Sequence, residues 1–355
     1  MSGGAQTLAN ILSQPEAWRS FALEWPRHEA LLDESRLLRD AGRLIFTGCG
    51  SAYFAAQTLA AMAASKLGVA SVAVTASDAA LFPETAFTGG GHLTLVALSR
   101  SGQTSETVEA VMAFRRVSDG PVLALTSVPD SDLARAGDHL LDASVGDEPG
   151  IVQVRSISTL LLLGLAAIAH TAGEPVAEPL ARLPDVAAQY LDAARPLAQK
   201  FGRDPAITRF FFLGAGPWRG TASESMLKVK EMSRAQSESF HTLEFRHGLG
   251  ANANEQSLVV GLLSDRAADA ERAVLDEFRT AQGATTLAIG ASAAVSADAR
   301  SYALAVAADL PEWARIPLAL PFAQLLGWER ARLNGLDPDE PENLKAFIAL
   351  EGRLV

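Results

Sequence analysis

Hydroxyl side chains are crowded into one short segment of the chain. Residues 93–114 read LTLVALSRSGQTSETVEAVMAF, and this segment carries Ser99, Ser101, Thr104, Ser105 and Thr107. An apolar run of strand length, 93–98, precedes them, and residues 106–114 have the apolar spacing of a helix. The hydroxyls therefore fall at a helix start, where free backbone N–H groups and the helix dipole favour an anion. One hydroxyl there is typical of a helix cap, whereas five predict a phosphate-binding loop.

A second group of charged residues lies on one predicted helix later in the chain. Glu224, Lys228 and Glu231 have the spacing i, i+4 and i+7, so one face of the helix presents two carboxylates around an ammonium. Apolar residues stand among them and favour burial of the helix, and a solvated charged face is the alternative interpretation. A carboxylate whose pKa is tuned by burial and by a neighbouring cation is suited to general-base catalysis.

Histidines and acids follow this helix in the segment SFHTLEFRHG. It contains His241, Glu244, Arg246 and His247, which raises the question of a metal site. The sequence has no His-Glu-x-x-His pair, which would place two ligands on one helix face. We therefore do not expect a metal at this segment.

These residues belong to a chain that repeats one plan. RLIFTGCGSAYFAAQTLA resembles RFFFLGAGPWRGTASESML, and the segment around Ser99 parallels the segment around Ser264. Both copies alternate strands and helices, so we expect an α/β fold with two flavodoxin-like or Rossmann-like domains, each a parallel sheet sandwiched by helices. Binding loops of such sheets lie at the carboxyl ends of strands, where Ser51 and Ser99 both fall. A dinucleotide site is disfavoured, because GCGSAYFA lacks the third glycine.

The two copies differ in the loop that follows the matched strand. The second copy reads SDRAA from Ser264, with Asp265 where the first copy has hydroxyls, so only the first is expected to bind phosphate there. A Pro- and Ala-rich helical connector separates the copies. The predicted organisation is a helical arm interrupted at Pro26 (1–40), a phosphate-binding domain (41–173), a helical linker (174–205), a domain with the charged helix (206–335) and a C-terminal tail (336–355).

Composition excludes several classes of function. The 355-residue chain has a formal net charge of −11, which argues against a nucleic-acid partner, because phosphate backbones are bound by excess Lys and Arg. The one cysteine, Cys49, cannot form an internal disulfide and fits a reducing cytoplasm. The N-terminus lacks a signal-peptide pattern, and the most apolar segment, 158–173, is shorter than the roughly 20 residues that span a bilayer. We expect that segment to be a buried helix, and the protein to be cytoplasmic with no membrane partner.

The duplicated plan, the SRSGQTSET loop, the LKVKE helix and EFRHG together resemble the sugar isomerase (SIS) family. The resemblance covers nearly the whole chain and is strongest to the isomerase half of glucosamine-6-phosphate synthase and to stand-alone phosphosugar isomerases and deaminases. It implies two tandem SIS domains and a substrate that is an amino- or keto-hexose 6-phosphate. It implies no cofactor.

The resemblance also implies which residues hold the substrate. In the family a serine–threonine loop grips the sugar phosphate, and by position this role falls to Ser51, Ser99, Arg100, Ser101 and Thr104. The position after Ser51 is a serine in the synthase and Ala52 here, which removes one donor. The residues expected to line the sugar and to set specificity are Gly150, Gln153 and Arg155.

Catalytic roles follow from the same resemblance. Glu231 matches the carboxylate that moves a proton between C1 and C2 of the sugar, and Lys228 and Glu224 match its supporting helix face. His247 matches the histidine that opens the sugar ring, which the family supplies from the neighbouring subunit. The resemblance therefore implies a homodimer with shared sites.

Two departures from the family pattern bear on the reaction. The chain begins Met1-Ser2-Gly3, without the glutaminase domain of the synthase, so we expect no glutamine-dependent synthesis. In the tail, Ala346 occupies the position of the imine-forming lysine of the family, and Lys345 lies one residue before that position. Either imine chemistry is lost or a rearranged tail lets Lys345 serve. Proton abstraction by Glu231 survives in both cases.

Three functions remain open at this point. The favoured one is an enzyme of the aldose–ketose isomerase or aminosugar-phosphate deaminase type. A dehydratase or deglycase would eliminate water or an amine after the same proton removal. A non-catalytic phosphosugar sensor need not keep Glu231 and His247, and would normally carry a basic DNA-binding segment, for which the arm has too few basic residues.

Overall fold

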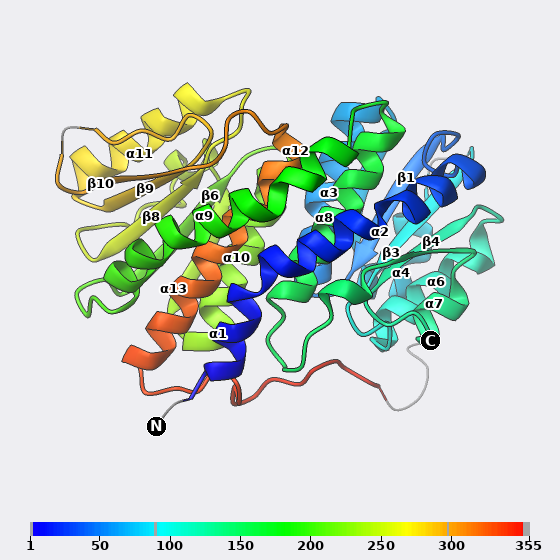
Figure 1. Cartoon of the computed structure of the whole chain (residues 1–355), viewed down its shortest axis with the longest axis horizontal. Coiled ribbons are helices and arrows are strands. Elements are labelled where there is room, and N and C mark those ends of the chain that lie inside the picture. Colours follow the sequence, from blue (N-terminus) through cyan, green and yellow to red (C-terminus); the bar gives the residue numbers. More distant parts are fainter. Residues whose placement is uncertain (1–2, 89–90, 297, 351–355) are drawn as a thin grey trace. The chain divides into compact units, whose positions relative to one another are not determined.

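The computed structural model describes residues 3–88, 91–296 and 298–350 and contains two parallel five-stranded sheets (Figure 1). The strand order is β2-β1-β3-β4-β5 in the first sheet and β10-β9-β8-β6-β7 in the second. Read from β7, the second sheet repeats the order of the first, so β6 corresponds to β1 and β8 to β3. The duplicated α/β fold predicted from the sequence is confirmed.

The strands are short and mostly buried. They are β1 (Arg43–Gly48), β2 (Ala70–Thr75), β3 (Leu93–Leu98), β4 (Val122–Thr126), β5 (His139–Asp142), β6 (Arg209–Gly214), β7 (Gln236–His241), β8 (Ser257–Leu262), β9 (Thr285–Gly290) and β10 (Ser301–Ala305). The central strands β3 and β8 are buried at every position, because helices cover both faces of each parallel sheet.

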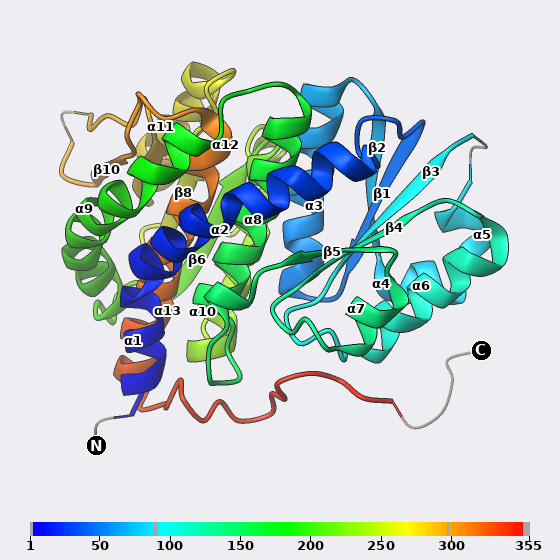
Figure 2. The ribbon, with the colours of Figure 1, turned by 45° about the vertical axis from the view of Figure 1, so that its right-hand side comes forward.

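Helices cover the two faces of each sheet. In Figure 2, α3 (Ser51–Leu67) and α8 (Arg155–Thr171) lie on one face of the first sheet, and α4 (Ala76–Leu81), α5 (Pro83–Ala86), α6 (Ser105–Val117) and α7 (Asp132–Ala136) lie on the other. On the second sheet, α11 (Ala268–Gln282) covers one face and α10 (Trp218–Ser233), packed against α13 (Leu320–Leu333), the other. The remaining helices are α1 (Ala5–Leu12), α2 (Gln14–Ser35), α9 (Ala177–Gly202) and α12 (Glu312–Arg315).

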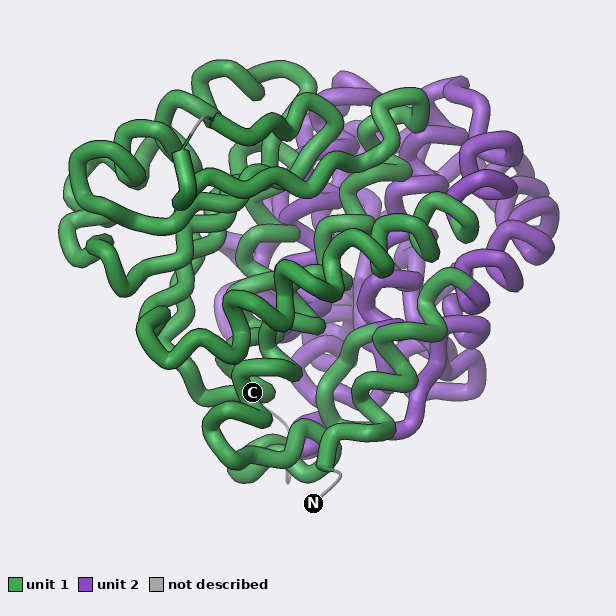
Figure 3. Tube along the Cα trace, turned by 60° about the vertical axis from the view of Figure 1, so that its left-hand side comes forward, with its two compact units in different colours: residues 1–15, 150–154, 184–344 green, residues 16–149, 155–183, 345–355 purple. Residues whose placement is uncertain are grey.

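The chain divides into two compact units, each built around one sheet (Figure 3). Unit 1 comprises residues 1–15, 150–154 and 184–344 and holds β6 to β10. Unit 2 comprises residues 16–149, 155–183 and 345–355 and holds β1 to β5. The phosphate loop predicted from the sequence therefore lies in unit 2, and the charged helix lies in unit 1.

The N-terminal arm differs from the sequence prediction. Helix α2 runs through Pro26, whereas we had expected an interruption there, and the arm instead breaks at Ser13, between α1 and α2. A proline inside a helix costs about 3 kcal/mol. Burial of Trp18, Phe21 and Trp25 on α2 offsets this cost, because each large apolar side chain contributes roughly 1.5–3 kcal/mol.

The most apolar segment of the sequence belongs to a buried helix, as predicted. Helix α8 is buried from Ser156 to Ala169. In the part of the chain that the structure describes, no helix combines the length and the apolar character that crossing a membrane requires.

Candidate active site

The hydroxyl-rich loop of unit 2 connects β3 to α6 at the carboxyl edge of the sheet. Ser99 and Arg100 in this loop are only 4% and 9% exposed. Ser99 N donates to Leu125 O on the neighbouring strand at 3.1 Å. Ser99 Oγ accepts from Gly102 N at 3.1 Å and lies 3.3 Å from Thr104 Oγ1. The loop is thus held in one shape by its own backbone and hydroxyl groups.

Glycine is required at the turn of this loop. Gly102 has φ +60°, and a Cβ atom there would lie 1.9 Å from Ser131 Oγ. Its carbonyl accepts from Leu133 N at 2.9 Å, and Ser101 Oγ accepts from Gln103 N at 3.2 Å. The loop therefore turns tightly before α6 begins.

The loop lies at the point where the strand order of the sheet reverses, between β1 and β3. Strand β1 stands between β2 and β3, so the connections after β1 and after β3 leave the sheet on opposite sides. Ser51 is the first residue of α3, after β1, and Ser105 is the first residue of α6, after β3. Ligands of open α/β sheets bind at such a point, and helix N-termini favour anions. The structure thus brings Ser51 and the Ser99 loop to one edge suited to phosphate.

Glu224, Lys228 and Glu231 form one ion-pair cluster on α10 of unit 1. Lys228 Nζ lies 2.6 Å from Glu231 Oε2 and 3.3 Å from Glu224 Oε1. The Lys228 side chain is 0% exposed, Glu224 is buried, and Glu231 is 21% exposed. Burial disfavours the ammonium form of Lys228, but the two carboxylates outweigh this effect and raise its pKa. The lysine therefore stays charged and holds the more exposed Glu231 carboxylate.

Close packing of α13 on α10 explains why this lysine is buried. A Cβ atom at Gly327 of α13 would lie 2.9 Å from Lys228 O, so the two helices approach at a glycine. A buried cation is tolerated only when it is paired, and the two glutamates of α10 provide that pairing.

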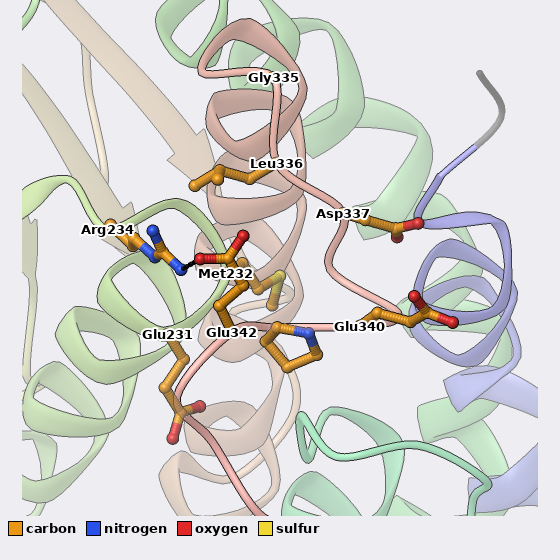
Figure 4. A pocket seen from close by; sticks show the side chains of 9 residues that line it. Glu231, Met232, Arg234, Gly335, Leu336, Asp337, Glu340 and Glu342 are labelled. Carbon is orange, nitrogen blue, oxygen red and sulfur yellow. Dashed lines mark hydrogen bonds and ion pairs between the residues drawn. The ribbon is translucent and has the colours of Figure 1, made fainter.

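Glu231 lines a cavity of about 290 Å³ within unit 1 (Figure 4). The tail contributes the other acidic lining residues, Asp337, Glu340 and Glu342, and Arg234 at the end of α10 pairs with Glu342. Figure 4 shows the Glu231 side chain pointing away from the Arg234–Glu342 pair. Its carboxylate is partly exposed, whereas its lysine partner is fully buried.

The remaining predicted residues, His247, Gln153 and Arg155, are divided between the two units. His247 is exposed and follows the short turn Glu244–Arg246, whose Phe245 is anchored in the core of unit 1. Gln153 is half-buried in unit 1, and its Oε1 has no hydrogen-bond partner among the described residues. Arg155 belongs to unit 2 and donates from Nε to Gly146 O at 3.4 Å.

The tail contacts were not predicted from the sequence. Asp339 accepts hydrogen bonds from Gln6 N at 3.0 Å and from Thr7 N at 2.7 Å, so it caps α1. Lys345 and Ala346 are both exposed. These contacts join residues more than 300 positions apart, and no local pattern indicates such a partner. Across residues 3–88, 91–296 and 298–350, no group of three or more His, Cys, Asp or Glu side chains is arranged to hold a metal ion.

Comparison with known proteins identifies the family. The SIS domain model matches residues 37–170. A Streptomyces coelicolor protein, provisionally named D-galactosamine-6-phosphate deaminase, is 30% identical to this chain over 94% of the chain and 91% of its own length. The chain therefore belongs to the SIS domain family, as its resemblance implied. A glutamine–fructose-6-phosphate aminotransferase of Pyrobaculum aerophilum is 29% identical over 97% of this chain, which spans 57% of that longer protein.

Solved structures agree with this assignment. Glucosamine-6-phosphate deaminase of Thermotoga maritima superposes with a TM-score of 0.80 at 26% identity, covering 98% of this chain and 100% of that one. Tagatose-6-phosphate ketose/aldose isomerase of Escherichia coli has a TM-score of 0.86 at 22% identity, covering 99% and 98% of the two chains, and shows the shared fold. The chain is thus a two-sheet SIS protein of the phosphosugar isomerase and deaminase type.

Proposed function

We propose that this protein is an enzyme that transfers a proton between C1 and C2 of a hexose 6-phosphate and deaminates a 2-amino-2-deoxyhexose 6-phosphate. The observation that carries the proposal is the Glu231 carboxylate, which is 21% exposed and lies 2.6 Å from the buried Lys228 ammonium. The names of two relatives, both aminosugar-phosphate deaminases, support the choice of an amino sugar.

Phosphate binding is assigned to unit 2 in this proposal. Ser51, Ser99, Arg100, Ser101 and Thr104 offer hydroxyl, guanidinium and backbone donors at two helix starts. The ionised phosphate would gain charge-assisted hydrogen bonds there, which are about twice as strong as neutral ones. The phosphate then fixes the sugar, so that binding energy from a non-reacting group positions the reacting carbons.

Proton transfer is assigned to Glu231. Its carboxylate removes the C2 proton of the open-chain aldose, and the electron pair forms the C1–C2 double bond of an enolamine while O1 takes up a proton. The carboxylic acid then returns its proton to C1, and the nitrogen loses a proton as the C2 imine forms. The resulting C2 imine adds water and releases ammonia, which leaves a ketose 6-phosphate. Lys228 is a positioning residue, because its fully buried ammonium lies 2.6 Å from the Glu231 carboxylate and fixes its place on α10. The reaction written here requires no oxidant and no cofactor.

Ring opening is assigned to His247, supplied to the neighbouring subunit of a homodimer. Its exposed position after an anchored turn supports this role. Mixing inactive Glu231→Gln and His247→Ala chains should restore up to about a quarter of the wild-type activity. Half of the randomly formed dimers contain one chain of each variant, and one of the two sites in each mixed dimer is intact. Independent sites within each chain would give no recovery.

The experiment that tests the proposal follows hydrogen exchange at C2. We would incubate the protein in deuterated water with glucosamine, galactosamine, fructose and tagatose 6-phosphates, and follow C2 signals and ammonia release. Deuterium at C2 of the aldose or at C1 of the ketose, together with ammonia from an amino sugar, all lost in Glu231→Gln, are the expected results. General acid–base catalysis contributes about 10²–10⁴-fold, so the variant should be slower by at least about 100-fold. Tight binding of a sugar phosphate without exchange in either protein would instead indicate a phosphosugar sensor.

A further inference from the structure

The end of the described chain lies against the start of α6 in unit 2. Ser105 N, in the first residue of α6, donates to Ile348 O at 3.1 Å. Ser105 Oγ accepts from Leu350 N at 3.0 Å, and Arg100 Nη2 donates to Ala346 O at 3.3 Å. Three hydrogen bonds therefore join residues 345–350, which we call the tail segment, to the loop that we assign to phosphate binding.

Two of these bonds use donors that are suited to an anion. A backbone N–H group at a helix start and an arginine guanidinium are both common phosphate ligands. The residue before α6, Thr104, makes no side-chain capping bond to the helix, so its hydroxyl does not take the place of an external acceptor. Instead the carbonyl oxygens of Ile348 and Ala346, which carry partial negative charge, accept from these donors.

The three hydrogen bonds of the tail segment all use its main-chain atoms. Its apolar side chains stay partly open to solvent, because Phe347, Ile348 and Leu350 are 43%, 44% and 41% exposed. Hydrogen bonds to neutral carbonyls are weaker than charge-assisted bonds to a phosphate. A phosphate that reaches Ser105 N and Arg100 would therefore displace the segment.

We propose that the tail segment is an internal competitor of the substrate phosphate. It occupies the Ser105 N–H group and the Arg100 guanidinium in the ligand-free protein and leaves them when phosphate binds. This inference rests on the proposed function, because it takes residues 99–105 as the phosphate site. It also assigns a role to the tail that does not depend on Lys345 or on imine chemistry.

A pair of substitutions at one position tests the competition. Leu350→Pro removes the N–H group that donates to Ser105 Oγ, whereas Leu350→Ala shortens the side chain and keeps that donor. Losing one hydrogen bond should weaken the competitor, so inorganic phosphate should bind the full-length Leu350→Pro protein about threefold to tenfold more tightly than the Leu350→Ala protein by calorimetry. Equal or weaker phosphate binding by Leu350→Pro overturns the inference.

A chain that ends at Leu344 provides the stronger test, since it lacks all three contacts. Its phosphate affinity should rise by at least as much as in Leu350→Pro, and Ser99→Ala should weaken phosphate binding in both backgrounds. If wild-type and shortened chains bind phosphate equally, the competitor is excluded while the phosphate site stands. If neither chain binds inorganic phosphate or glucosamine 6-phosphate, the proposed function fails together with the inference.

Hydrogen exchange reports on the same segment without any substitution. Saturating inorganic phosphate should speed exchange of the backbone amides in the tail segment, because the Leu350 N–H group loses its acceptor. Slower exchange on phosphate binding would mean that the segment closes over the ligand, and it would overturn the competition.

Discussion

Ser99 in unit 2 and Ser264 in unit 1 follow the corresponding strands β3 and β8, but their hydroxyl groups have different partners. Ser99 Oγ accepts from Gly102 N at 3.1 Å, within a loop of further hydroxyls. Ser264 instead donates to the fully buried carboxylate of Glu271 on α11, from N at 2.7 Å and from Oγ at 3.1 Å. An internal carboxylate thus takes the donors that an external anion would need.

The helices that follow β1 and β6 also differ, and here it is the helix of unit 1 that carries the cluster of charged residues. Helix α3 after β1 reads SAYFAAQTLAAMAASKL and carries one charged residue, Lys66, near its end. Helix α10 after β6 carries the Glu224, Lys228 and Glu231 cluster. The comparison shows that the two halves of one fold carry different chemistry: the first has the hydroxyl-rich loop, and the second has the buried ion-pair cluster.

The largest expected effect comes from removing the cation of that cluster. Lys228→Met leaves two carboxylates without their shared buried partner, so unfolding should cost about 3–5 kcal/mol less. Chemical denaturation measures this change. Lys230→Met on the exposed face of the same helix is the matched control and should change stability by less than about 0.5 kcal/mol. Equal effects of the two substitutions would show that the cluster has no special energetic role.

An intermediate effect is expected on phosphate affinity, and it distinguishes the loop at Ser99 from the loop at Ser264. Ser99→Ala should weaken binding of inorganic phosphate about tenfold, because a hydrogen bond to a charged group is lost. Ser264→Ala should leave phosphate affinity unchanged and lower stability by about 1 kcal/mol, because Glu271 loses a donor. Calorimetric titration and denaturation of both variants provide the measurements, and a phosphate-binding defect in Ser264→Ala would contradict the comparison.

The smallest expected effect concerns the pH dependence of stability. Burial raises the pKa of Glu271 above its ordinary value of 4.5, although hydrogen bonds from Ser264 oppose the shift. The folded state then binds more protons than the unfolded state just above pH 4.5, so this residue makes stability fall as pH rises through that window. Glu271→Gln removes this contribution, so the stability of the variant should fall less than that of the wild type as pH rises above 4.5. An unchanged slope would show that Glu271 titrates normally.

Local sequence patterns predicted the fold more completely than they predicted the site contacts. The repeat predicted two parallel sheets, and the apolar run at 93–98 coincides with β3. The break expected at Pro26 was wrong, because aromatic burial along α2 outweighs the local preference of proline. Local propensity contains no information about such tertiary packing.

In the candidate site, too, the sequence predicted which residues share a helix but not all of their contact partners. The spacing of Glu224, Lys228 and Glu231 predicted one face of a helix, and the structure shows them in contact. In the second loop the sequence prediction concerned only Asp265, which stands where the first copy has hydroxyls. The structure pairs Asp265 with Arg315, and the acid that accepts from Ser264 is Glu271, which the sequence analysis did not single out. Spacing indicates which residues share a helix face, but it does not indicate which of two nearby acids turns inward.

The most direct test of the division between the halves measures C2 deuterium exchange against substrate concentration. Glucosamine 6-phosphate would be used with wild-type, Ser99→Ala and Glu231→Gln proteins. We expect Glu231→Gln to lower kcat at least about 100-fold with nearly unchanged KM, and Ser99→Ala to raise KM about tenfold with nearly unchanged kcat. If Glu231→Gln exchanges at the wild-type rate, or if both variants lose only affinity, the assignment of proton transfer to the second half is wrong.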